Sequence, residues 1–204
     1  FNQDGTEAEM CGNGARCFAR FAQRQLDGRS SISFETLAGV IQSNLEGERV
    51  TIGLTPPENL RLDDRISTST GETEIHSVNT GVPHAVLFVD DADKAMVSEL
   101  GHEIRHHDHY APAGTNVNFV QLTGDNSIRV RTYERGVGET LACGTGVTAS
   151  GLITAKLHGY SSPISVRVLG GDDLGVAFET EGDGFKNVQL SGPADFVYSG
   201  QIEI

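Results

Sequence analysis

The sequence predicts an α+β fold made of two similar, pseudo-symmetric domains, each with antiparallel strands wrapped around one central helix. Three observations predict it: an internal repeat, a Cys-Gly-x-Gly element in each copy, and the same order of helix and strands after each element. A Pro-rich segment at Thr55-Pro56-Pro57 is the best linker candidate. We therefore expect a first domain over residues 1–55 and a second over residues 56–195.

The repeat is found when the chain is shifted by 132 residues, which places Glu7–Gly39 on Glu139–Gly171 without a gap. Nine of the 33 aligned positions are identical, including Cys-Gly-x-Gly at residues 11–14 and 143–146. Nine identities would be weak evidence for a repeat by themselves. The repeat gains weight because each copy continues with the same kinds of element.

Each copy continues with one helix and a run of strands. In the first copy, the helical spacing of Ala15, Phe18, Phe21 and Ala22 predicts a helix over Ala15–Gln25. In the second copy, Val147–His158 is the predicted helix and Gly159 its C-terminal stop. The strands predicted after the two helices are Ser31–Leu37, Val40–Leu45, Arg49–Leu54, Ser165–Leu169, Gly175–Thr180 and Asn187–Leu190.

The segment between the copies predicts further strands and one short helix, Asp93–Leu100. These strands are Glu74–Thr80, Ala85–Val89, Asn116–Leu122 and Ile128–Tyr133.

Composition and charge exclude several classes of protein. The net charge of −13 would repel a phosphate backbone, so we expect no nucleic-acid partner. No apolar run is long enough for a membrane span, which predicts no membrane partner and a cytoplasmic protein. Three cysteines in a chain of 204 residues fit neither a disulfide scaffold nor a paired CxxC zinc site, and they favour a reducing compartment.

The paired Cys-Gly-x-Gly elements indicate thiol chemistry. Their glycines let the backbone approach a ligand and turn into a helix, which places each cysteine at a helix N-terminus. Unpaired amides and the helix dipole at that end favour a carboxylate and lower a thiol pKa from roughly 8.5 toward neutrality. If the two elements face each other, one sulfur lies on each side of a bound α-carbon, which suits inversion of that centre by proton transfer.

Longer motifs resemble the diaminopimelate epimerase family. Asn2-Gln3-Asp4-Gly5 through Cys17 resembles the first catalytic motif of that family, and Tyr133-Glu134-Arg135-Gly136 through Gly146 resembles the second. Gly81-Val82-Pro83-His84 and Asn116-Val117-Asn118-Phe119 match the two signatures between them. The resemblance spans the whole chain, and its topology would return residues 196–204 to the first domain as the last strand.

The resemblance implies interconversion of LL- and meso-2,6-diaminopimelate, a step of lysine and peptidoglycan-precursor biosynthesis, without pyridoxal phosphate or a metal. Cys143 would be the thiolate base in the LL-to-meso direction and Cys11 the opposing thiol acid, with His84 and Glu134 tuning them and the substrate. The substrate-binding residues that the resemblance implies are Asn2, Gly12, Asn13, Asn116, Glu134, Arg135, Gly144 and Thr145.

Two departures from the family pattern stand out. Val82 replaces an Asn that commonly contacts the remote end of the substrate. A His-Gly-x-Gly-Asn-Asp-Phe-like segment that opens family members is also absent. We therefore expect an N-terminal part of the first domain to be missing, and we do not expect the 204-residue chain alone to be active.

Several residues have plainer interpretations. We expect Cys17 to pack in the core, and Glu139 to bond to the amides of a turn rather than to raise a thiol pKa. His102 and His106 have the i, i+4 spacing of metal ligands, but with His107 and His109 they are better explained as a solvated helix end and loop.

Other functions stay open from the sequence. A related cofactor-independent racemase could act on proline, histidine or another amino acid, and Val82 keeps that alternative open. A thiol redox switch or a binding module would also explain two cysteines in one cleft. The sequence leaves the oligomeric state undetermined and allows a homodimer.

Overall fold

The computed structural model describes residues 11–37 and 39–202. The helices are α1 (Gly12–Gln25), α2 (Val97–Arg105) and α3 (Gly144–His158), with 3-10 turns η1 (Ala92–Lys94) and η2 (Asp108–Tyr110). The strands are β1 (Ser31–Thr36), β2 (Gly39–Glu46), β3 (Arg49–Gly53), β4 (Glu58–Thr68), β5 (Gly71–Asn79), β6 (Pro83–Phe88), β7 (Asn116–Gly124), β8 (Ser127–Glu134), β9 (Gly138–Thr140), β10 (Ile164–Val168), β11 (Asp173–Glu181) and β12 (Gly184–Pro193).

One continuous sheet connects the two copies of the repeat. Its strand order is β1-β2-β3-β12-β11-β10-β8-β7-β6-β5-β4, and β9 pairs with β8. The pairs β6–β7 and β8–β10 are parallel, whereas the other pairs are antiparallel. β12 from the second copy pairs with β3 from the first, so the end of the chain joins the two halves.

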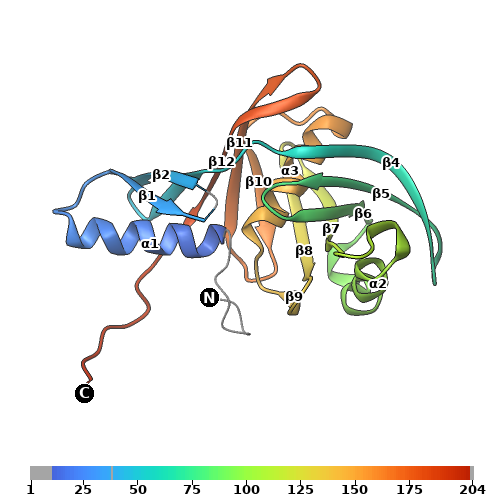
Figure 1. Ribbon diagram of the computed structural model, residues 1–204, viewed down its shortest axis with the longest axis horizontal. Coiled ribbons are helices and arrows are strands. Elements are labelled where there is room, and N and C mark those ends of the chain that lie inside the picture. The colour runs from blue at the N-terminus through green and yellow to red at the C-terminus, as the bar shows by residue number, and fades with distance from the viewer. Residues whose placement is uncertain (1–10, 38, 203–204) are drawn as a thin grey trace.

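Helix α3 is the central helix of the larger half. Its residues from Gly144 to Thr154 are buried, and it is surrounded by strands of the sheet (Figure 1). Over these residues the helix is buried on all sides and carries no charged side chain, as expected for a helix enclosed by strands. On the far side of β7 and β8, α2 forms a second apolar cluster with residues such as Phe119 and Ile104. The sheet is therefore packed on both faces in this half.

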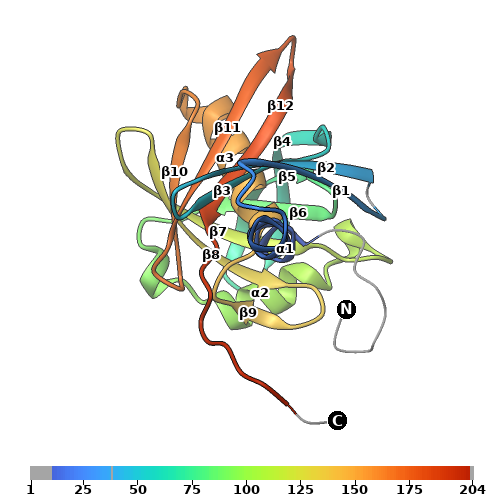
Figure 2. The same cartoon turned by 90° about the vertical axis from the view of Figure 1, so that its left-hand side faces the viewer.

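Helix α1 packs on β1, β2 and β3, and Figure 2 shows it almost along its axis. It buries Ala15 and Ala19, whereas Phe18 and Phe21 are about half exposed, at 50% and 53%. The two small residues let the helix lie close to the strands, and Phe18 packs at its edge against Phe34, with ring centroids 4.7 Å apart.

The N-termini of α1 and α3 meet. A Cβ atom added to Gly144 would lie 3.4 Å from the Cα atom of Gly12, and one added to Gly12 would lie 3.5 Å from Gly144 Cα. Leu190 of β12 packs beneath both glycines, and its Cδ2 atom would be 2.9 Å from a Cβ at Gly144. We call this contact of Gly12, Gly144 and Leu190 the helix junction. A Cβ atom at either glycine would crowd the Leu190 side chain, whereas its distance to the other glycine would be an ordinary van der Waals contact.

The predicted fold class is confirmed: α and β elements form a large sheet around helices, with the order of elements repeated after each cysteine. The predicted helix over Asp93–Leu100 lies across η1 and the start of α2. Strands β4 and β9 were missed. β4 carries alternating Leu60, Leu62 and Ile66, but the positive φ angles of Asn59 (55°) and Asp63 (61°) bend it and interrupt its register with β5.

The predicted division into two domains stays a prediction. Residues 54–57 have no regular structure, as expected of the proposed linker. Residues 196–202 form no strand, so the last strand predicted there is wrong over those residues, whereas residues 203–204 lie outside the described part. The segment nevertheless touches α1, because the Arg24 guanidinium lies 5.1 Å from the Phe196 ring centroid and Arg20 donates a hydrogen bond to the Ala194 carbonyl.

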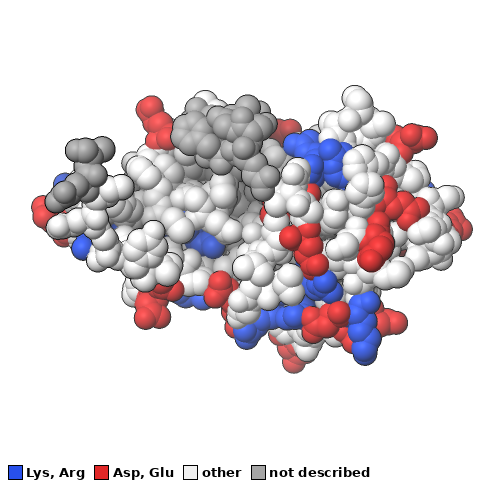
Figure 3. Space-filling model, turned by 90° about the horizontal axis from the view of Figure 1, so that it is seen from below, with Lys and Arg blue, Asp and Glu red and all other residues white. Residues whose placement is uncertain are grey.

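Charge is unevenly distributed on the surface. Seen from below, the half of the molecule around α1 is mostly uncharged, whereas acidic and basic side chains crowd the other half (Figure 3). Within residues 11–37 and 39–202, no helix is both long enough and apolar enough to cross a membrane.

Truncating Leu190 tests the helix junction. Leu190 is fully buried, so Leu190→Ala leaves a cavity under both glycines and is expected to lower the free energy of unfolding by about 2–5 kcal/mol. Urea denaturation measures this change. Leu122→Ala, at a side chain that is 39% exposed, is the control and should lose under about 1 kcal/mol. Equal losses in the two variants would contradict the packing described.

Candidate active site

Cys11 and Cys143 occupy equivalent positions, each immediately before a helix. Both are N-cap residues with extended backbones, Cys11 before α1 and Cys143 before α3. The first amides of an α-helix have no acceptor within the helix, and they carry its positive dipole end. Because Gly12 and Gly144 are in contact, these two amide-rich ends lie side by side. A carboxylate at the helix junction would therefore meet amides from both helices.

Cys11 is exposed, and its sulfur is already engaged with the start of its own helix. The Gly14 amide donates a hydrogen bond to Cys11 Sγ at 3.3 Å. A Cβ atom at residue 14 would lie 3.5 Å from that sulfur, which is an ordinary van der Waals contact. The Cys11 thiol is therefore exposed to solvent at the start of α1, beside the helix junction.

Cys143 is buried, with 8% of its surface exposed. Burial raises the pKa of Cys143 to about 12, and the charges of Glu134 and Cys11 act in the same direction, whereas the Thr145 hydroxyl and the Gly146 amide oppose them. The prediction of a pKa near neutrality was therefore wrong for Cys143, because desolvation outweighs the helix terminus. The influence of Cys11 on Cys143 also places the two thiols within electrostatic reach of each other.

A polar stripe crosses three strands beneath the N-terminus of α3. The parallel register pairs His84 of β6 with Asn116 of β7, and the antiparallel register pairs Asn118 with Thr132 of β8. Because side chains alternate along a strand, His84, Asn116, Asn118 and Thr132 share one face of the sheet. Val117, between the two asparagines, lies in the apolar cluster on the opposite face. All four polar residues are buried.

Hydrogen bonds connect this stripe to Cys143. His84 Nε2 lies 2.9 Å from Thr145 Oγ1, which lies 3.5 Å from Cys143 Sγ. On the other side of the ring, Asn118 Nδ2 lies 3.2 Å from His84 Nδ1. Burial lowers the pKa of His84 to about 3, and the charge of Arg135 acts in the same direction, so the ring is neutral near pH 7. We call the series Asn118–His84–Thr145–Cys143 the buried relay.

The predicted remote-end residues lie together beside the relay. The Arg135 backbone amide donates to Asn116 Oδ1 at 2.8 Å, and Thr140 Oγ1 donates to Glu134 Oε1 at 2.6 Å. The Arg135 guanidinium reaches the Ala113 carbonyl at 3.3 Å. Glu134 and Arg135 are half-buried, so both charges border the site without being sealed inside it. Asn2 lies outside the described residues.

Asn13 joins the two helices, and Arg16 supports it. Asn13 Nδ2 donates to the Ala142 carbonyl at 3.1 Å, one residue before Cys143, while Arg16 Nη2 donates to Asn13 Oδ1 at 3.0 Å. Arg16 also bonds to the Gly12 and Pro193 carbonyls. Burial lowers the pKa of Arg16, and the thiols of Cys17 and Cys11 act against this. Sequence reasoning missed this positioning role, although a buried Arg one turn after an N-cap Cys is a usable signal.

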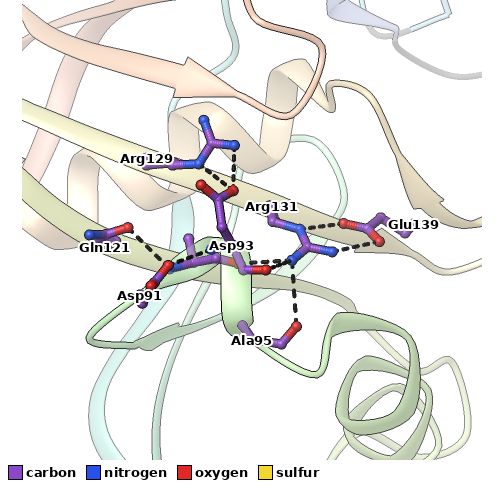
Figure 4. Close-up of polar contacts among 8 residues, drawn as sticks. Asp91, Asp93, Ala95, Gln121, Arg129, Arg131 and Glu139 are labelled. Carbon is purple, nitrogen blue, oxygen red and sulfur yellow. Dashed lines mark hydrogen bonds and ion pairs between the residues drawn. The ribbon is translucent and has the colours of Figure 1, made fainter.

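Glu139 holds the segment that leads to Cys143, but not through turn amides. Its carboxylate accepts two hydrogen bonds from Arg131, at 2.6 and 2.9 Å (Figure 4). Arg131 also donates to the carbonyls of Ala92 and Asp93 in η1. The predicted turn role of Glu139 was therefore wrong: it forms an ion pair that ties β8 and β9 to η1.

Other predictions concern residues away from the junction. Cys17 is exposed, so the prediction that it packs in the core was wrong; it lies on the open side of α1. His102 and His106 are exposed at the end of α2, as predicted. Asp63, Glu74 and His76 have potential ligand atoms within 4.8 Å of one another. However, His76 Nδ1 accepts the Asp63 amide at 3.0 Å, which indicates a structural role in the β4–β5 pair.

Comparison with known proteins agrees with this geometry. A family model described as diaminopimelate epimerase matches residues 1–59 and 76–197. The chain belongs to the diaminopimelate epimerase family. It is 46% identical to a diaminopimelate epimerase of Hydrogenobaculum over 99% of this chain and 73% of that protein. It is 44% identical to one of Aquifex aeolicus over 99% of this chain and 72% of that protein.

The fold is shared more widely than the sequence. The structure of a hydroxyproline epimerase from Agrobacterium vitis matches with a TM-score of 0.72 at 20% identity, over 94% of this chain and 65% of that one. Such a likeness shows that the architecture is common to epimerases of this type.

Gly146→Ala tests the packing of the relay against α3. A methyl group at residue 146 would overlap Asn118 Oδ1 and lie 3.3 Å from Thr132 Oγ1. We expect it to lower the free energy of unfolding by about 1–3 kcal/mol, although Ala is the better helix former. Gly14→Ala, at the equivalent position of the repeat, meets only ordinary contacts and should be neutral or stabilising. Thermal and urea unfolding compare the two, and an equal response at both sites would rule out this packing.

The raised pKa of Cys143 predicts a specific dependence of stability on pH. The folded protein holds the Cys143 proton up to about pH 12, whereas the unfolded chain releases it near its ordinary pKa of 9.0. Stability from this group is therefore complete below about pH 9 and is lost as the pH rises toward 12, with a slope of up to about 1.4 kcal/mol per pH unit. Urea unfolding under reducing conditions from pH 8 to 10 should show a steeper decline than in Cys143→Ala. Parallel curves would contradict the assignment.

Proposed function

We propose that this protein interconverts LL- and meso-2,6-diaminopimelate by two-base proton transfer, without pyridoxal phosphate or a metal, for lysine and peptidoglycan-precursor biosynthesis. One observation carries the proposal: two cysteine-capped helix N-termini meet at Gly12 and Gly144. The family membership of the chain supplies the substrate.

The helix junction accounts for binding of the reacting carboxylate. Amides of Gly12 and Asn13 in α1 and of Gly144 and Thr145 in α3 would donate to its oxygens. When the α-proton leaves, its electron pair delocalises into that carboxylate, which gains negative charge. Amides already aimed at this position stabilise the developing charge more strongly than the ground state.

The two sulfurs perform the proton transfers on opposite faces. In the LL-to-meso direction, the Cys143 thiolate takes the α-proton and forms its S–H bond. The Cys11 thiol then gives its proton to the other face of the α-carbon and is left as a thiolate. The centre is inverted and the total charge is unchanged. The reverse direction exchanges the two roles, so each cysteine alternates between acid and base.

The buried state of Cys143 requires that ionisation accompanies substrate binding. Its high pKa keeps it a thiol in the free protein, and Glu134 contributes to that. An α-ammonium group that pairs with Glu134 neutralises this contribution and places a positive charge near the sulfur. Both changes favour the thiolate. Glu134 would thus couple arrival of the amino acid to activation of the base.

The distal end of the substrate would be held by Asn116 and Arg135, together with Asn2. Asn116 and Arg135 are already connected by a hydrogen bond between the Arg135 amide and Asn116 Oδ1. A second amino-acid group, with its own carboxylate and ammonium, suits an arginine and two amides. Proline has no such distal group, so this polar end disfavours a proline racemase. Val82 removes one polar contact that family members commonly have.

We also propose that the enzyme works in the cytoplasm as a small-molecule enzyme without nucleic-acid or membrane partners. Cys11, Cys17 and Cys143 are free thiols in the structure, and a two-thiol mechanism needs a reducing compartment. Oxidation of the pair to a disulfide would remove both acid and base. A homodimer stays a proposal that sedimentation of the purified protein would decide.

Cysteine substitution tests the reaction in the full-length protein. LL-diaminopimelate should be converted to the meso form, as measured by chiral chromatography, and Cys11→Ala and Cys143→Ala should each lower kcat by at least a hundredfold, on the order of general acid–base catalysis. Cys17→Ala, on the exposed side of α1, is the matched control and should keep full activity.

Two results would overturn the proposal. Full activity in both Cys11→Ala and Cys143→Ala would exclude the thiol mechanism. Turnover of proline, hydroxyproline or histidine with no turnover of diaminopimelate would keep the mechanism and replace the substrate.

A further inference from the structure

The buried relay has a single direction of donation, and Asn118 sets it. Asn118 Nδ2 lies 2.9 Å from the Ala85 carbonyl and 3.2 Å from His84 Nδ1, while Thr132 Oγ1 lies 2.9 Å from Asn118 Oδ1. A backbone carbonyl can only accept a hydrogen bond. The atom of Asn118 next to Ala85 must therefore be the amide nitrogen, since a flipped side chain would set two oxygens against each other.

This orientation fixes the tautomer of His84. The same Nδ2 group points its second hydrogen at His84 Nδ1, so Nδ1 must carry a lone pair rather than a proton. A neutral imidazole has one proton, which then resides on Nε2. His84 Nε2–H accordingly donates to Thr145 Oγ1. The low pKa of His84, which burial and the charge of Arg135 cause, keeps the ring singly protonated.

The direction continues to the sulfur. Thr145 Oγ1 accepts from His84, so its own hydrogen is free to point at Cys143 Sγ, 3.5 Å away. Every donor of the relay then faces Cys143: amide to imidazole, imidazole to hydroxyl, hydroxyl to sulfur. Hydrogen bonds donated to a charged acceptor are roughly twice as strong as neutral ones, so this order stabilises the thiolate more than the thiol.

We propose that Asn118 is a positioning residue for the reaction: it locks His84 as a neutral Nε2–H donor, and through the Thr145 hydroxyl it stabilises the Cys143 thiolate. His84 therefore takes no proton from Cys143. This inference rests on the proposed function, because a stabilised thiolate matters only where Cys143 acts as a base. The proton of Cys143 therefore leaves by a route that does not pass through His84.

The alternative is that His84 is the base that deprotonates Cys143. It requires an unprotonated Nε2 facing the Thr145 hydroxyl and a proton on Nδ1. That arrangement sets the Nδ1 proton against the Asn118 amide, which the Ala85 carbonyl prevents from turning. On the Oδ1 side, Asn118 packs closely against Gly146 of α3, where an added Cβ atom would overlap Oδ1. Asn118 has no exposed surface, so bulk solvent does not reach its amide.

Nitrogen NMR of the unsubstituted full-length protein tests the tautomer without any activity measurement. With ¹⁵N-labelled histidine, long-range proton–nitrogen spectra at pH 7 distinguish protonated from unprotonated ring nitrogens, and His84→Gln assigns the signal. We expect a proton on Nε2 and none on Nδ1. A proton on Nδ1, or a doubly protonated ring, would overturn the inference. Asn118→Asp, which offers only an acceptor when ionised, should move the proton to Nδ1.

Alkylation of Cys143 tests the effect on the thiolate. Iodoacetamide reacts with the thiolate, so its rate at a fixed pH follows the thiolate fraction. Thr145→Val removes the hydroxyl and should slow labelling of the Cys143 peptide, measured by mass spectrometry, about tenfold, which is one pKa unit. Thr145→Ser should restore the rate. Thr154→Val, which removes an equally buried hydroxyl bonded only to Ser150, should leave it unchanged.

The outcomes separate this inference from the proposed function. An Nε2–H tautomer and a slowed Thr145→Val reaction in a protein that does not epimerise diaminopimelate would retain the relay and reject the function. Epimerisation with a proton on Nδ1, or with unchanged alkylation in Thr145→Val, would retain the function and reject the relay.

Discussion

The contact between Gly12 and Gly144 is the constraint on which the site depends. It brings two helix N-termini together over Leu190, and each terminus carries a cysteine as its cap. A side chain on either glycine would crowd Leu190 beneath the two amide-bearing helix ends. Asn13 and Arg16 reinforce the contact from the first helix, whereas the ion pair of Arg131 and Glu139 steadies the segment before Cys143.

The two halves of the repeat are alike in backbone and unlike in environment. Cys11 is exposed at the end of a half-covered helix, whereas Cys143 lies above a polar stripe inside the larger half. Burial alone would leave Cys143 a very weak acid. The relay from Asn118 and the approach of a positive ammonium both act against that burial. In the proposed mechanism, hydrogen bonds and substrate charge thus oppose desolvation.

The sequence predicted what is local or repeated. The helices after Cys11 and Cys143 follow from glycine positions and apolar spacing, and the internal repeat by itself indicates that the two cysteines are paired. It did not predict β4, because Asn59 and Asp63 adopt positive φ angles within an alternating strand. It also misjudged the exposure of Cys17 and the pKa of Cys143, because exposure and desolvation depend on distant parts of the chain. Asn118 was visible in the Asn-x-Asn alternation, but its partners are set by strand register.

Early isotope incorporation tests the central claim, that two sulfurs serve opposite faces of one α-carbon. The full-length protein is incubated with LL-diaminopimelate in deuterium oxide, and both isomers are analysed by mass spectrometry at low conversion. Two separate bases predict deuterium at the inverted α-carbon of the meso product, while the recovered LL substrate stays almost unlabelled. Equal labelling of recovered substrate and product, or transfer of the original hydrogen into the product, would indicate a single base and contradict the account.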